Sequence, residues 1–150
     1  MRTSRKPLPP TYMLICLVGT VALHFLFPIA RILRAPYVLL GILPLVLGLA
    51  INVWADGIFK RESTTVKPFE TSAALVTDGP FRFSRHPMYL GMVAVLLGVA
   101  VLLGSASPFV GPVALFATFE VLFIPHEERS LEATFGATYT DYRERVRRWL

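Results

Sequence analysis

The chain has few charged residues and a single cysteine, and both scarcities narrow the classes of protein to which it can belong. Charged residues make up 17% of the 150 residues, whereas they approach about a quarter of an ordinary soluble domain. The lone Cys16 excludes an intrachain disulfide, and its position in an apolar run fits simple packing. The sequence has no Ser/Gly-rich linker, internal repeat or low-complexity tract, so we expect residues 1–150 to form one domain.

Hydrophobic residues are abundant instead and make up 54% of the chain. A helix that spans a bilayer needs about 20 apolar residues, within a range of about 17 to 25. Four stretches meet this requirement, at residues 11–30, 36–59, 88–104 and 108–124. We therefore expect an all-α integral membrane protein with four transmembrane helices, followed by a cytosolic amphipathic helical segment at residues 127–148. Pro28 predicts that the first span kinks or ends early.

The basic residues are distributed unevenly, and their distribution predicts the orientation in the membrane. Three precede the first stretch, five lie from Lys60 to Arg85, and five follow Pro125, whereas only Arg31 and Arg34 lie elsewhere. Cytosolic segments are enriched in Lys and Arg, so both termini should be cytosolic, with 13 of the 15 basic residues inside. The net charge of +5 then reflects orientation and contact with anionic lipid, not nucleic-acid binding, because no DNA- or RNA-reading pattern accompanies it.

A first candidate for chemistry lies just before the third apolar stretch, on the predicted cytosolic side. The sequence Arg85-His86-Pro87 places proline where it suits the first turn of a helix. The unpaired N–H groups of such a turn, together with the positive end of the helix dipole, favour a carboxylate or phosphate ligand. The alternative is a plain helix start at which Arg82 and Arg85 contact lipid headgroups.

A second candidate follows the fourth apolar stretch, where the chain reads Pro125-His126-Glu127-Glu128-Arg129. Two adjacent carboxylates at a membrane boundary have the chemistry to bind ribose hydroxyls, to balance a cation or to act as a general base. They equally suit the acidic first turn of a helix, which its dipole stabilises. The sequence leaves both interpretations open.

The C-terminal segment has an amphipathic pattern. Apolar and aromatic residues recur at helical spacing at Leu131, Phe135, Tyr139, Tyr142, Val146 and Trp149, and Arg143, Arg145, Arg147 and Arg148 lie between the last of them. This pattern predicts a helix that lies on the bilayer surface, with Gly136 dividing it into two pieces.

These separated motifs together resemble the isoprenylcysteine carboxyl methyltransferase family, whose superfamily includes bacterial relatives and the phospholipid N-methyltransferases. The resemblance is carried by residues 75–81, by Arg85-His86-Pro87-Met88-Tyr89-Leu90-Gly91, and by Glu127-Glu128 with the aromatic residues that follow. It extends from Thr64 to Leu150, and the first two spans match only as apolar helices. For a bacterial-type member, the location it implies is the inner membrane.

The resemblance implies an enzyme that uses S-adenosylmethionine without a Rossmann sheet, and the chain has no GxGxxG motif after a strand. No metal is implied. The positions that the resemblance assigns to the cofactor are Ala73, Ala74, Leu75, Val76, Phe81, His86, Pro87, Met88, Tyr89 and Glu127.

The catalytic and substrate positions are hypotheses. Glu128 and His126 are the candidates for a proton acceptor. In the prenylcysteine enzymes an arginine that contacts the substrate lies one helical turn before the first glutamate, and Phe123 stands at that position here. An apolar ring cannot bind a carboxylate, although Arg129 is a possible substitute from the other side.

We therefore expect methyl transfer to an amphiphilic small molecule or lipid that enters from the bilayer, at the cytosolic face. Carboxyl O-methylation of prenylcysteine is the alternative reaction. A non-catalytic membrane protein, such as an efflux subunit or sensor, is the alternative of another class, and it would favour an acidic residue deep in a span.

Overall fold

The computed structural model describes residues 8–62 and 74–150, and these residues form a helical structure. Its α-helices are α1 (Pro9–Leu26), α2 (Ile42–Arg61), α3 (Pro87–Leu103), α4 (Val110–Thr118), α5 (Ile124–Phe135) and α6 (Ala137–Arg145). Short 3-10 helices are η1 (Tyr37–Gly41), η2 (Gly79–Arg82) and η3 (Ser107–Phe109), and η4 (Phe119–Phe123) is a π-helical turn. The expectation of an all-helical fold is confirmed.

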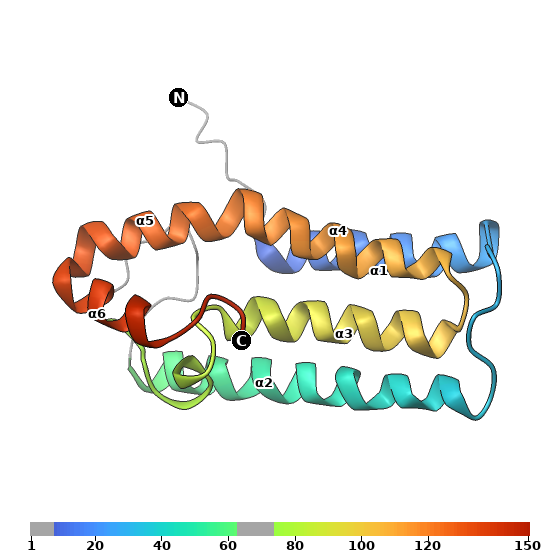
Figure 1. Ribbon diagram of the computed structural model, residues 1–150, viewed down its shortest axis with the longest axis horizontal. Helices are drawn as coiled ribbons and strands as arrows, with labels where there is room; N and C mark the ends of the chain where they lie inside the picture. Colours follow the sequence, from blue (N-terminus) through green and yellow to red (C-terminus); the bar gives the residue numbers. More distant parts are fainter. Residues whose placement is uncertain (1–7, 63–73) are drawn as a thin grey trace.

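The long helices lie side by side in a bundle, with α3 in its interior (Figure 1). Helix α3 packs against α1, α2 and α4. The α1–α2 and α3–α4 connections lie at one end of the bundle, whereas α5, α6 and the start of α3 gather at the other end (Figure 1). The polar segments singled out in the sequence therefore meet at a single end of the molecule.

Three of the helices are long and apolar enough to cross a membrane, among the residues described: Pro9–Leu26, Tyr37–Arg61 and Ser107–Phe135. Helix α3 is a shorter apolar helix of 17 residues. The 29-residue helix is about 43 Å long at about 1.5 Å per residue, so it exceeds an apolar layer of about 30 Å. Its polar part after Pro125, with Glu127 and Glu128, therefore lies beyond the apolar stretch.

One expected boundary was wrong. The fourth apolar stretch and the following segment are not separate, because α4, η4 and α5 form one continuous helix. The wider π-helical turn precedes Pro125 and makes room for a ring that would otherwise clash with the carbonyl of the preceding turn. Helix α1 ends at Leu26, ahead of Pro28, as the early-end alternative predicted.

The C-terminal segment also differs from the single amphipathic surface that the periodicity predicted. Gly136, with φ of +51°, separates α5 from α6 as expected, but α6 ends at Arg145. Val146 is extended, and the chain beyond it runs back toward the start of α3. Trp149 therefore belongs to this returning tail and not to a surface helix.

Helices α2 and α3 approach each other closely through glycines. A Cβ atom added at Gly48 would lie 2.4 Å from the carbonyl oxygen of Gly91, which no side chain tolerates. Small residues permit such backbone contact between membrane helices. Also on α3, a core of Tyr89, Met92 and Leu96 packs against aromatic residues of the long helix and fixes where α3 begins relative to α5.

Candidate functional site

The segment before α3 positions the first group of polar side chains. Pro87 occupies the first turn of α3, where its missing N–H costs nothing. The N–H of His86 donates to Ser84 Oγ at 3.2 Å, which fixes the extended segment just ahead of the helix. His86 is 4% exposed, so its imidazole lies inside the protein and not at the lipid surface.

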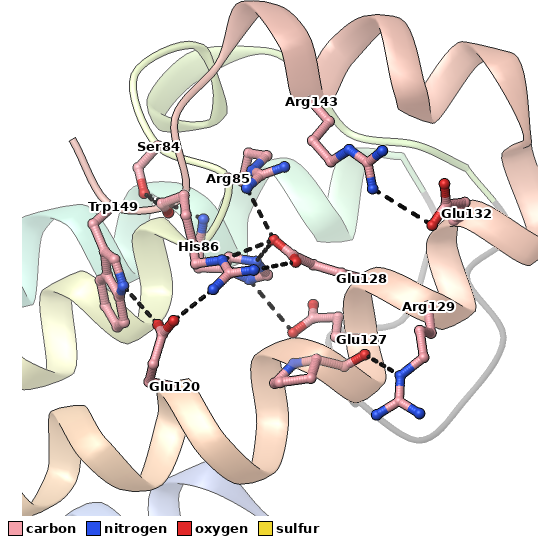
Figure 2. Close-up of polar contacts among 12 residues, drawn as sticks. Ser84, Arg85, His86, Glu120, Glu127, Glu128, Arg129, Glu132, Arg143 and Trp149 are labelled. Carbon is pink, nitrogen blue, oxygen red and sulfur yellow. Dashed lines mark hydrogen bonds and ion pairs between the residues drawn. The ribbon is translucent and has the colours of Figure 1, made fainter.

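Glu128, on the first turns of α5, is the centre of a charged cluster (Figure 2). Its Oε1 lies 3.1 Å from Nη2 of Arg85 and 3.4 Å from Nε2 of His86. Arg148 of the tail donates to it twice, from Nε to Oε1 at 3.2 Å and from Nη2 to Oε2 at 2.7 Å. Burial opposes ionisation of Glu128, but the hydrogen bonds from His86 and Arg148 and the charges of both arginines lower its pKa to about 2.

His86 lies between the two carboxylates of α5. Its Nδ1 is 3.6 Å from Oε2 of Glu127, while its Nε2 faces Glu128 (Figure 2). Burial alone would lower the pKa of His86, but the two carboxylates outweigh burial and raise it. The two carboxylates therefore favour the imidazolium form of His86.

A small pocket that is partly open to solvent lies beside this cluster. It is lined by Phe59, Phe81, Arg85, His86, Pro87, Met88, Tyr89 and Glu127. Three elements that are distant in the sequence thus contribute to it: the end of α2, the start of α3 with its preceding segment, and the start of α5.

Two pocket residues carry buried polar atoms without a hydrogen-bond partner among the residues described. These atoms are Nε and Nη1 of Arg85 and Oε2 of Glu127. The Arg85 side chain is only 9% exposed, so water satisfies these donors poorly. A ligand with an anionic group for Arg85 and a donor for Glu127 fits the pocket.

Six of the residues expected to contact a cofactor come together in this pocket: Phe81, His86, Pro87, Met88, Tyr89 and Glu127. Val76 is buried with Ala55 and Phe81 in an adjoining apolar cluster, and Ala74 and Leu75 are half-buried nearby in the sequence. Ala73 lies outside the described residues.

The residues expected to act on the substrate are placed differently. Phe123 is buried in the core, with its ring 5.3 Å from that of Tyr12. His126 and Arg129 are exposed, and Arg129 donates to the carbonyl of Pro125 within its own helix. None of these three lines the pocket.

The sequence did not single out several residues that the structure brings to the site. Arg85 stood in the stretch that carries the family resemblance but was given no role other than lipid contact, and Arg148 was one of several arginines in the tail. Glu120, near the site end of the apolar part of the long helix, accepts from Nη1 of Arg148 and from Nε1 of Trp149. The available signal was the acidic residue itself, since carboxylates in apolar helices are rare and usually paired.

Among the residues of the described ranges, no group of three His, Cys, Asp or Glu side chains is placed to hold a metal ion.

Comparison with known families gives a match over most of the chain. Residues 36–138 match the sequence model of the family described as Phospholipid methyltransferase. This range contains η1, α2, α3 and the whole long helix, including every residue that lines the pocket. No solved structure matches the chain significantly.

Individual relatives match over shorter ranges. A protein-S-isoprenylcysteine O-methyltransferase A of Arabidopsis thaliana is 35% identical over 78 residues, which are 52% of this chain and 40% of that protein. A protein-S-isoprenylcysteine O-methyltransferase of Schizosaccharomyces pombe is 38% identical over 73 residues, 48% of this chain and 30% of the yeast protein. An uncharacterized protein of Haemophilus influenzae is 35% identical over 63 residues, 42% of this chain and its own whole length. The matched region thus spans less than half of either named enzyme.

Proposed function

Because the chain belongs to the phospholipid methyltransferase family, we propose that it transfers a methyl group from S-adenosylmethionine to an amphiphilic acceptor. The acceptor is a small molecule or lipid that reaches the site from the bilayer, and membrane lipids surround the protein. The observation that carries this proposal is the pocket at the start of α3, where six residues expected to contact the cofactor converge.

The chemistry of the pocket fits S-adenosylmethionine. The free donors of Arg85 suit the carboxylate of its methionyl part, which is a planar anion matched to a guanidinium fork. Glu127, whose Oε2 faces His86 but accepts no hydrogen bond among the described residues, suits its amino group or its ribose hydroxyls. Phe59 and Phe81, whose rings pack edge to face at 5.2 Å, offer an apolar surface to adenine.

When bound, the cofactor would supply a methyl group on a positively charged sulfur, and an acceptor that attacks the methyl carbon in line would release S-adenosylhomocysteine. The protein would mainly provide alignment, and good alignment lowers a barrier by about 7 to 11 kcal/mol. Tyr89 and Met88 lie on the first turn of α3 and line the pocket wall. Glu128 and His126 are the candidates to take the proton of the methyl acceptor, although the lowered pKa of Glu128 makes it a weak base, and Glu127, which lines the pocket, is a third candidate.

We further propose that this end of the bundle faces the cytosol and that both termini do so as well. The end that holds the site also holds Arg61, Arg85 and the arginines of α6 and the tail, as the positive-inside rule favours. The protein would then lie in a cell membrane, as in the bacterial inner membrane, with α3 as a fourth span inside the bundle.

A second candidate reaction is carboxyl O-methylation of prenylcysteine, which the names of the plant and yeast relatives favour. Phe123 argues against it, since a buried aromatic ring stands where those enzymes carry a substrate-binding arginine. A carboxylate left unpaired in an enclosed site costs several kcal/mol. We therefore favour a neutral nucleophile, such as an amine or thiol. The alternative of another class, a non-catalytic efflux subunit or sensor, predicts that the pocket does not bind S-adenosylmethionine.

The test compares acceptors with the purified protein in detergent. Methyl transfer from labelled S-adenosylmethionine is measured with membrane lipid extract and with N-acetyl-farnesylcysteine. We expect label in the lipid extract and little in the prenylcysteine. Efficient base-labile labelling of the prenylcysteine would favour the carboxyl reaction instead, and no transfer to either acceptor would count against the proposed activity.

A further inference from the structure

The C-terminal tail, residues 146–150, is built into the site although it is distant from it in sequence. The N–H of Arg85 donates to the carbonyl of Arg147 at 2.9 Å, and Ser84 Oγ donates to the carbonyl of Arg148 at 3.1 Å. The backbone of the tail is thus attached to the two residues that precede His86.

The side chains of the tail reach the long helix on the other side of the site. Arg148 forms a bidentate pair with Glu128 and donates from its third nitrogen to Glu120. Trp149 donates to Glu120 at 2.9 Å, and its ring lies 4.6 Å from that of Phe116. The tail therefore bridges the segment before α3 and the helix that carries Glu127 and Glu128.

Three cationic groups converge on Glu128, and they differ in what else they do. Arg85 and His86 line the pocket, whereas Arg148 does not. Arg148 uses its fork on both oxygens of Glu128, and such a pair fixes a carboxylate in orientation as well as in charge. A carboxylate held in this way can orient the groups on its pocket side, Arg85 and His86.

We propose that Arg148 is a positioning residue, which holds Glu128 so that Glu128 orients Arg85 and His86 in the pocket and leaves Glu127 to face the ligand. This inference rests on the proposed function for the identity of the ligand. It gives Glu128 an orienting role and Glu127 a ligand-facing role, and it makes the tail a part of the site.

The test uses Arg148→Gln, with Arg145→Gln as the matched control. Arg145 is also an arginine of the C-terminal region, but it is exposed and its Nε donates to the carbonyl of Asp141 within α6. Both variants lose one positive charge. The probe is S-adenosylhomocysteine, whose binding to the detergent-purified protein is measured by calorimetry across a range of pH.

We expect Arg148→Gln to weaken binding about tenfold or more, and Arg145→Gln to bind as the wild type does. The charged and titratable groups that face Glu128 are Arg85 and His86 before α3, Arg148 in the tail, Tyr139 of α6 and Glu127 beside it. Without Arg148 the pKa of Glu128 rises, so the loss of binding in acid should begin at higher pH in Arg148→Gln alone. A purely structural role for Arg148 predicts that Arg148→Gln binds more weakly but loses binding in acid at the same pH as the wild type, and that result would overturn the inference. Equal affinity and equal pH dependence of the two variants would overturn it as well.

A second variant, Arg148→Lys, covers the case in which Arg148→Gln does not fold. Lysine keeps the charge but not the fork, so we expect binding about three- to tenfold weaker than in the wild type, and wild-type affinity would contradict the positioning role.

A cofactor-free readout separates this inference from the proposed function. If the wild type itself fails to bind S-adenosylhomocysteine, the proposed function fails, but the unfolding temperatures of the variants still test Arg148. In the wild type and in Arg145→Gln, Glu128 contributes stability that is present above its unfolded pKa and lost as the pH falls toward its lowered folded value. The stability gap between Arg148→Gln and Arg145→Gln should therefore be nearly constant above about pH 5 and narrow as the pH falls from about pH 5 toward about pH 2, and a gap that stays constant over that acid range would refute the role of Arg148.

Discussion

Glu127 and Glu128 are neighbours in the chain, yet their surroundings differ. Glu128 is 11% exposed and is met by Arg85, His86 and Arg148, so its charge is balanced inside the protein. Glu127 is 30% exposed, lines the pocket and has an oxygen without a hydrogen-bond partner in the part of the chain that the structure describes. Glu128 is thus placed to orient its partners, whereas Glu127, whose Oε2 has the ion pair with His86 but no hydrogen bond among the described residues, can still accept one from a ligand.

The charge of His86 is a testable consequence of this arrangement. Burial favours the neutral imidazole and the two glutamates favour the cation, and the glutamates prevail, so the pKa of His86 should lie above its ordinary value of about 6.5. NMR titration of the protein with labelled histidine, assigned by a His86→Gln variant, measures this directly. A midpoint below about 6.5 would show that desolvation dominates.

The same shift predicts a dependence of stability on pH. Because the folded pKa of His86 is raised, its stabilising contribution is fully present below the unfolded pKa and is lost as the pH rises through the folded value. The difference in unfolding temperature between the wild type and His86→Gln should thus shrink as the pH rises above about 6.5. A difference that grows in alkaline solution would contradict the imidazolium assignment.

At the scale of elements, the contact between α2 and α3 sets where the site can form. The two helices touch through backbone at Gly48 and Gly91, and α2 ends beside the pocket with Phe59. We expect Gly48→Ala to force the helices apart, with a loss of about 1 to 3 kcal/mol in unfolding free energy.

Gly57 provides the control for this prediction, because it lies in the same helix with no atom within 4 Å of an added Cβ among the described residues. Gly57→Ala should be neutral or stabilising, since alanine favours a helix over glycine by up to about 1 kcal/mol. Thermal unfolding in detergent compares the two variants. Equal stability of Gly48→Ala and Gly57→Ala would mean that the close contact is absent.

The elements also show what the sequence could reveal about this protein. Hydropathy located the apolar helices, Pro87 marked the start of α3, and Gly136 marked the division between α5 and α6, because each of these signals is local. The π-helical turn and the return of the tail were missed. Both depend on contacts between distant residues, such as Arg148 with Glu120, which no helical period contains.

At the scale of the molecule, the charge asymmetry along the bundle predicts the orientation. The end with the α3–α4 connection should face outward, and the end with the site should face the cytosol. After Cys16→Ala, a cysteine introduced as Ala106→Cys should react with an impermeant thiol reagent added to intact cells. A cysteine introduced as Asp141→Cys, on exposed α6, should react only after permeabilisation. The reverse pattern would invert the topology.

The central claim is that the pocket at the start of α3 binds the cofactor through Glu127, and calorimetric titration with S-adenosylhomocysteine tests it most directly. The proteins to compare are the wild type, Glu127→Gln and Glu132→Gln, since Glu132 lies in the same helix but pairs with Arg143 away from the pocket. Loss of a hydrogen-bonded carboxylate costs about 1.5 to 3 kcal/mol, so Glu127→Gln should bind at least about tenfold more weakly, while Glu132→Gln binds as the wild type does. Unchanged affinity in a folded Glu127→Gln protein, or no binding to the wild type, would contradict the claim.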